Sequence, residues 1–176
     1  LSVSNLQTAV IGATENSVYF VYADPYRMTS PMATYDVAAS SVIYGMCSNT
    51  QVQSFDSNPE VVSQDAADKG RLLLTDKSVV LSGGPGPHWC VKYLEDARLT
   101  PVYFQNDGTN IKFIETKTDT AKVDRALDSM DFDHEDYFVV MTLRDENNNQ
   151  VFINYGFGWK GTWASGIQLK AMHPTI

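Results

Sequence analysis

Several patterns are scarce in this chain of 176 residues, and each absence narrows its chemistry. The two cysteines, Cys47 and Cys90, lack CxxC spacing and the three histidines are scattered, so no zinc-binding pattern is present. Apolar runs are short, as at residues 138–141, and none approaches the roughly 20 residues of a membrane span. Since no signal peptide begins at Leu1, we expect a mature protein or a piece excised from a longer chain.

Positive charge is also scarce. With 13 basic and 21 acidic residues the net charge is −8, which repels nucleic-acid phosphates and anionic lipid headgroups. We therefore expect no nucleic acid among the partners. Only 19% of residues are charged, a composition compatible with an extracellular setting, whereas 43% are apolar, enough for a folded core.

The order of predicted elements indicates an α/β fold. Strands and helices alternate in the first half, which favours parallel pairing, and hairpins follow in the second half. We predict a single three-layer domain over residues 1–176, with a mixed, mostly parallel sheet, a C-terminal antiparallel hairpin and helices on both faces. The predicted strands are 18–22, 51–55, 78–82, 101–105, 110–115, 136–144 and 150–155, after an entry strand or arm within 1–16.

Helices are predicted from caps and apolar spacing. Ser30 and Pro31 open the first, whose stripe is Met32, Tyr35, Ala39, Val42, Ile43 and Met46. The Asn58-Pro59-Glu60 signal opens a second, which Gly70 ends. A third faces the core through Trp89, Tyr93, Leu94 and Ala97. A short helix at 122–130 and a last helix at 162–172 complete the set.

The loop Gly83-Gly84-Pro85-Gly86-Pro87 lies between a predicted strand and a predicted helix. A helix N-terminus can hold an anion, so Gly83, Gly84, Gly86 and the N–H of His88 form a candidate anion or ligand site. However, the prolines remove donors and the lysine of a phosphate-binding P-loop is missing. The favoured interpretation is a rigid strand-to-helix turn.

A second glycine turn spans residues 156–161 and matches G-x-G-x-x-G after a strand. A dinucleotide site needs a further strand and an acidic residue about 20 positions on, but the sequence given ends at Ile176. We therefore interpret the glycines as allowing the last helix to pack closely on the sheet. No cofactor is indicated.

An acidic cluster, with His134 inside it, offers oxygen ligands that could bind calcium. An EF-hand loop counted from Asp131 would need Gly at position 136 and Glu at position 142, and has Asp136 and Thr142 instead. We interpret the cluster as a solvated loop, and predict no metal site. Its acidic members are Asp128, Asp131, Asp133, Glu135 and Asp136.

Nucleophilic catalysis has little support. His88 and Cys90 stand two residues apart at a helix start, where their side chains diverge, and no third partner is evident. No G-x-S-x-G elbow occurs. Cys47 and Cys90 could form one disulfide or remain two buried thiols. Because no catalytic set is complete, we predict that the chain is not an enzyme.

Three segments occur together in a characteristic order: VVLSGGP at 79–85, which VKYLE at 91–95 follows, then EDYFVV at 135–140 and GFGWKGTWA at 156–164. The set resembles archaeal S-layer and S-layer-like cell-surface proteins, over roughly residues 78–170. Those proteins carry a strand ending in V-G-G-P, an acidic-Asp-Tyr strand start and a late G-T-x-A turn. Ser82 departs from that pattern, and no Asn-x-Ser/Thr glycosylation acceptor is present.

The resemblance implies a non-catalytic structural domain, extracellular or in the cell envelope, whose partners are other surface-protein subunits or domains. Two alternatives stay open. The glycine turns could make the chain a flavodoxin-like protein or enzyme that binds a nucleotide or another anion. The acidic loop from Asp131 to Asp136 could make it a calcium-dependent adhesive module.

Overall fold

The computed structural model describes residues 18–25, 32–44 and 50–172. Its main sheet has five strands in the order β2-β1-β3-β8-β7. The first four, β1 (Val18–Tyr22), β2 (Thr50–Phe55), β3 (Ser78–Ser82) and β8 (Gln150–Gly156), are parallel, and β7 (Phe138–Arg144) runs antiparallel to β8. The predicted α/β class, mixed sheet and C-terminal hairpin are confirmed.

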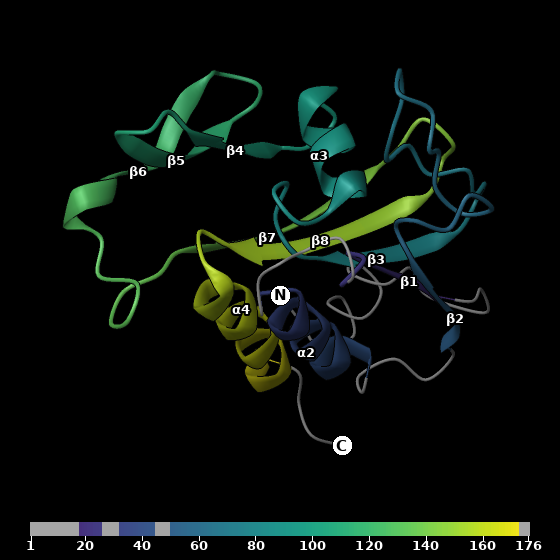
Figure 1. The fold of residues 1–176 in the computed structure, drawn as a ribbon, viewed down its shortest axis with the longest axis horizontal. Coiled ribbons are helices and arrows are strands. Elements are labelled where there is room, and N and C mark those ends of the chain that lie inside the picture. The colour runs from purple at the N-terminus through teal and green to yellow at the C-terminus, as the bar shows by residue number, and fades with distance from the viewer. Residues whose placement is uncertain (1–17, 26–31, 45–49, 173–176) are drawn as a thin grey trace.

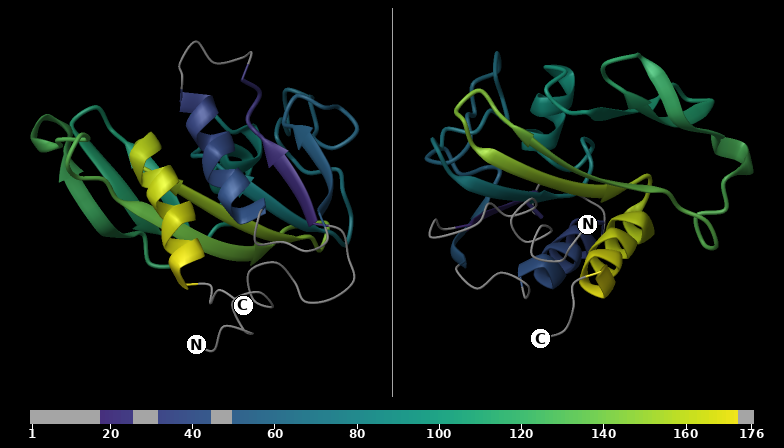
Figure 2. Two further views of the ribbon diagram at one scale, coloured as in Figure 1. Left: turned by 90° about the horizontal axis from the view of Figure 1, so that it is seen from below. Right: turned by 180° about the vertical axis from the view of Figure 1, so that it is seen from behind.

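In the part of the chain that the structure describes, three α-helices pack around this sheet (Figure 1). The helices α2 (Met32–Tyr44) and α4 (Trp159–Met172) lie side by side below it in that view, whereas α3 (Trp89–Asp96) lies above it. Figure 2 shows the α2–α4 pair from below, in front of the sheet. Among the described residues, no helix is both long and apolar enough to cross a membrane.

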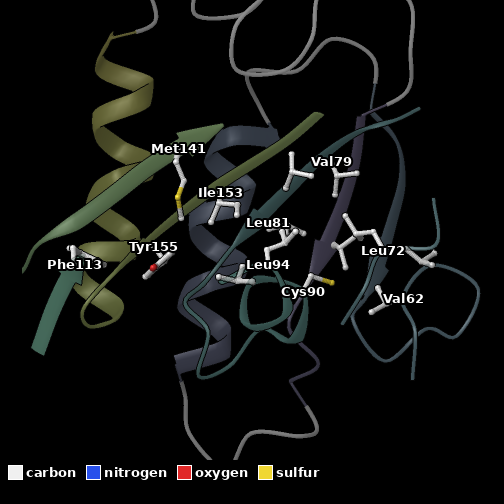
Figure 3. Close-up of a cluster of buried hydrophobic side chains, with 14 residues drawn as sticks. Val62, Leu72, Val79, Leu81, Cys90, Leu94, Phe113, Met141, Ile153 and Tyr155 are labelled. Carbon is white, nitrogen blue, oxygen red and sulfur yellow. The ribbon is translucent and has the colours of Figure 1, made fainter. Parts of the chain in front are cut away.

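The central strands are buried on both faces, which explains their nearly continuous apolar sequences. Side chains alternate between two clusters: Phe20, Val80 and Phe152 face α2 and α4, whereas their strand neighbours face α3. The α3-side cluster is the larger and is drawn in Figure 3. Its labelled members include Val79, Leu81, Leu94, Ile153 and Tyr155.

A second, antiparallel sheet contradicts the prediction of one sheet. Strands β4 (Val102–Asn106), β5 (Asn110–Glu115) and β6 (Thr120–Ala126) pair only with one another among the described strands. The helix predicted at 122–130 is therefore wrong, since most of that segment is β6, followed by one 3-10 turn, Leu127–Ser129. Pairing with β5 satisfies its backbone, which local helix propensity could not anticipate.

The helix predicted to start at Asn58-Pro59-Glu60 is also wrong. Asn58 Oδ1 accepts the N–H of Glu60 at 2.9 Å, and its carbonyl accepts the N–H groups of Val61 and Val62. This local turn leads into an isolated bridge between Val62 and Leu72 rather than a helix. An Asn–Pro pair serves turns as readily as caps, so the same residues allowed either outcome.

Smaller differences concern helix faces and ends. In α3 the buried side chains are Cys90, Val91, Leu94 and Glu95, so Leu94 alone of the predicted inward set is fully buried. The last helix begins at Trp159, three residues before the predicted start. The entry segment 1–16, the Ser30-Pro31 cap and Cys47 lie outside the described residues.

Candidate functional site

The two glycine turns meet at one edge of the main sheet. β3 and β8 are adjacent and parallel, so their carboxyl ends and the loops that follow lie together. The loop after β3 leads to α3 on one face, and the loop after β8 leads to α4 on the other (Figure 1). Such diverging connections leave a crevice outside the carboxyl ends, where open α/β sheets bind ligands.

A cavity of about 150 Å³ occupies this crevice. A wider surface depression of about 730 Å³ shares Pro85, Gly86 and Phe104 with it. Both glycine turns and the helix α2 contribute to the cavity wall. The described lining residues are Asp36, Gly84, Pro85, Gly86, Pro87, Phe104, Tyr155, Gly156, Phe157, Gly158, Trp159 and Thr162.

The first glycine turn has already used two of the four groups in its predicted anion site. The N–H of Gly83 donates to Asn154 O at 3.0 Å, and the N–H of His88 donates to Gly84 O at 3.0 Å. Gly84 and Gly86 do line the cavity, but Gly83 and His88 are absent from its described lining. Binding of an anion by this loop stays a prediction.

Gly83 also meets a steric demand. Its φ of +117° is a conformation that L side chains rarely adopt, and a Cβ there would lie 2.7 Å from Asp36 Oδ2. The turn therefore needs glycine at this position to bring β3 against α2.

His88 is a buried structural residue rather than a solvent-facing base. Its Nδ1 accepts the N–H of Cys90 at 3.3 Å, capping α3, and its Nε2 lies 2.8 Å from Val21 O. These contacts assign the proton to Nε2, because Val21 O can only accept. Cys90 is fully buried in the α3-side cluster, and its pairing with Cys47 stays a prediction.

The second glycine turn already holds an anion, and that anion is the side chain of Asp136. Asp136 Oδ2 accepts the N–H of Gly161 at 2.6 Å and that of Gly158 at 3.1 Å, at the start of α4. The carboxylate therefore occupies the donor-rich helix N-terminus that the G-x-G-x-x-G pattern would offer to a pyrophosphate.

Gly156 and Gly161 in this turn have no room for a side chain, as the sequence predicts. A Cβ on Gly156 would lie 2.4 Å from Gly161 Cα, and a Cβ on Gly161 would lie 2.8 Å from Asp136 Cγ. The Thr162 hydroxyl accepts the N–H of Gly156 at 3.0 Å, which holds the start of α4 against the end of β8. Close packing of the last helix on the sheet is confirmed.

The acidic loop does not gather into a calcium site. Asp136 caps α4, Asp133 pairs with Lys160 at 2.7 Å and Asp131 accepts from His134 at 2.8 Å. Within the described residues, no group of three or more His, Cys, Asp or Glu side chains could hold a metal ion. These three carboxylates thus have separate structural partners.

Asp36 is the residue of the site that sequence reasoning missed. It is 5% exposed on the buried face of α2, and its Oδ2 has no hydrogen-bond partner. Burial raises its pKa from 3.8 to about 7. A signal was available, because Asp36 stands three residues before Ala39 and seven before Ile43, on their apolar stripe.

Behind the cavity, Glu95 joins α3 to both sheets. Its Oε1 accepts the hydroxyl of Tyr155, whose ring lines the cavity, and its Oε2 accepts the N–H of Phe104 at 3.0 Å. Burial raises the pKa of Glu95 to about 7, and burial also raises the pKa of Tyr155 well above its usual value. Tyr155 therefore keeps its proton and donates it to Glu95, whose carboxyl group is only partly ionised near pH 7.

Aromatic residues of the second turn join the two sheets. The Phe157 ring stacks on Phe113 of β5 at a centroid distance of 4.3 Å, and Tyr155 meets Phe113 edge-on at 5.6 Å. Figure 3 shows Phe113 and Tyr155 next to each other at one end of the cluster. Tyr155 and Phe157 are thus packed against the small sheet, whereas Trp163 on α4 is 42% exposed.

No known protein family, curated protein or solved structure matches this chain. The meaning of the site therefore rests on its own geometry.

Proposed function

We propose that this chain is a non-catalytic α/β domain of an archaeal cell-surface, S-layer-like protein that acts through protein–protein contacts in the cell envelope. The segments that carry the resemblance support this proposal, because they form strands and turns of the fold, as the resemblance implies. The segment 79–85 is β3 and its turn, 135–140 leads into β7, and 156–164 is the tightly packed turn into α4. On this proposal the helices and main sheet make one three-layer domain.

An apolar edge strand is the observation that favours contact with another protein. Among the described strands, β7 is at one edge of the main sheet and β2 at the other. Phe138 and Val140 on β7 are each 38% exposed, and they share a face with Asn154 and Gly156, their partners on β8.

The edge strand β7 carries few of the features that normally prevent edge pairing, whereas β2 has a register shift of the bulge type where it pairs with Val18 and Tyr19. β2 has no charged residue, and β7 has one, Arg144, at its last position. Natural edge strands are usually blunted by lysine, proline or a bulge, because free N–H and C=O groups recruit other strands. We therefore infer that β7 pairs with a strand of a second copy, in the head-to-tail manner that builds extended arrays.

The catalytic alternatives have less support in this geometry. Cys90 and His88 are both fully buried, and the amides of the second turn bind Asp136. A nucleotide or another anion at the cavity would face Asp36, and none of its described lining residues is Lys or Arg. The calcium-dependent alternative would need carboxylates that converge, whereas these are paired separately.

The association is tested by Val140→Lys, which places a charge in the middle of the β7 edge. We expect the unmodified chain to associate as its concentration rises in sedimentation velocity and native mass measurements, and Val140→Lys to stay monomeric. Ala97→Lys adds the same charge at an exposed position after α3, and should associate normally. Equal behaviour of all three proteins would contradict pairing through β7.

The compartment is tested separately, by surface labelling of intact cells that express the protein. A membrane-impermeant reagent should label exposed lysines such as Lys92 and Lys122 without lysis. A signal that depends on lysis, like that of a cytosolic control protein, would defeat the cell-surface assignment.

A further inference from the structure

The described lining of the cavity between the two glycine turns includes a buried carboxyl group with an oxygen that has no hydrogen-bond partner. Asp36 lines the cavity and is only 5% exposed to solvent. Its Oδ2 makes no hydrogen bond. An unpaired buried carboxyl oxygen is costly, because it has lost water without gaining a donor. A ligand that brings a donor into the cavity would recover that lost interaction.

The rest of the wall favours a positively charged donor. Tyr155, Phe157, Phe104 and Trp159 contribute aromatic side chains, whose faces attract cations. None of the described lining residues is Lys or Arg, so no cation of the protein's own competes for Asp36 there. The net charge of −8 adds a general attraction for cations over anions.

The size of the cavity limits the ligand. A cavity of about 150 Å³ is comparable with one known to hold a benzene ring, so the apolar body is about one ring in size. We propose that this cavity binds a small organic ammonium ion, with its N–H groups on Asp36 Oδ2 and its apolar body against Tyr155 and Phe157. This binding is independent of association through β7.

Three probes of one shape test the charge requirement in the unmodified protein: benzylammonium, benzyl alcohol and benzoate. Each is titrated while backbone amide resonances are followed by NMR. We expect benzylammonium to shift Gly84, Gly86 and Thr162, and to bind roughly tenfold or more tightly than benzyl alcohol, because its hydrogen bond is charge-assisted. Benzoate should cause no shift at these residues.

Asp36→Asn tests the carboxyl group with little change of shape. We expect this variant to lose the preference for benzylammonium over benzyl alcohol, while Asp128→Asn, which removes an exposed charge, keeps it. If Asp36→Asn fails to fold, the titrations of the unmodified protein with the three probes still test whether the cavity prefers a cation. Equal binding of benzoate and benzylammonium, shifts confined to residues outside the cavity, or undiminished preference in folded Asp36→Asn would overturn the proposal.

Discussion

At the scale of single residues, the two glycine turns differ in why they contain glycine. Gly161 and Gly86 belong to the two turns around the same cavity, yet their surroundings are opposite. A Cβ on Gly161 would meet Asp136 at 2.8 Å, whereas a Cβ on Gly86 would meet nothing within 4 Å. One glycine is therefore required by packing and the other is not.

The first prediction compares these two positions. Gly161→Ala should lower the free energy of unfolding by about 1–3 kcal/mol, because the methyl group displaces the Asp136 carboxylate from the start of α4. Gly86→Ala, the matched control, should leave it unchanged or raise it by about 0.5 kcal/mol. Urea unfolding of both variants checks this, and equal effects would contradict the packing explanation.

The second prediction concerns the carboxylate itself. Asp136→Ala should destabilise the fold by about 1–2 kcal/mol, because the N–H groups of Gly158 and Gly161 lose their acceptor. Asp133→Ala removes only an exposed partner of Lys160 and should cost much less. Thermal unfolding distinguishes them, and similar melting temperatures would argue against a capping role.

The third prediction is a pH dependence caused by Asp36. Its pKa is about 7 in the folded protein and near 3.8 when unfolded, so the folded state binds more protons between these values. Stability should therefore fall as pH rises from about 4 to 7, and stay low above 7. Glu95, also raised to about 7, acts in the same direction.

Asp36→Asn should flatten part of this decline, because asparagine does not titrate. Between pH 5 and pH 8 the unmodified protein should lose on the order of 2–4 kcal/mol more than the variant. Urea unfolding at both pH values is the measurement. If both proteins lost the same amount, Asp36 would not be the titrating group.

Whole elements differ in how far the sequence predicts them. The strands β1, β3, β7 and β8 follow from runs of β-branched and aromatic residues, and α4 follows from the glycine turn before it. The failed helices at 58–70 and 122–130 lie where local signals were ambiguous. Their outcome depends on partners distant in sequence, such as the pairing of β6 with β5.

The candidate site was predictable in part for the same reason. Both glycine turns are visible as sequence motifs. They come together only because β3 and β8 pair in the sheet, although 67 residues lie between Ser82 at the end of β3 and Gln150 at the start of β8. Asp36 joins them through α2, and Asp136 through the approach to β7. Those contacts follow from topology, which spacing within one motif does not contain.

The fourth prediction concerns how the small sheet is attached. Phe113 of β5 is 1% exposed and packs on Phe157 and Tyr155, so it links the two sheets. Phe113→Ala should cost about 3–5 kcal/mol of stability, whereas Lys117→Ala, in the exposed turn after β5, should cost little. Circular dichroism with urea unfolding checks this, and a small loss for Phe113→Ala would mean that other contacts hold the small sheet.

At the scale of the whole molecule, helices pack on the main sheet, and among the described residues no further strand lies beside its edge strands β2 and β7. Helices pack on β1, β3 and β8 (Figure 2). At the carboxyl ends of the strands the two glycine turns line the small cavity, and the turn after β3 also lines the wider depression. The edge strand β7, with Phe138 and Val140 exposed, is the surface that we propose for contact with another protein.

Amide hydrogen exchange along β7, measured at low and at high protein concentration, tests this claim most directly. If a strand of a second copy pairs with β7, amides within Phe138–Arg144 that point away from β8 should exchange more slowly at high concentration, and Val140→Lys should abolish the difference. Exchange along β7 that stays the same at every concentration would contradict the account.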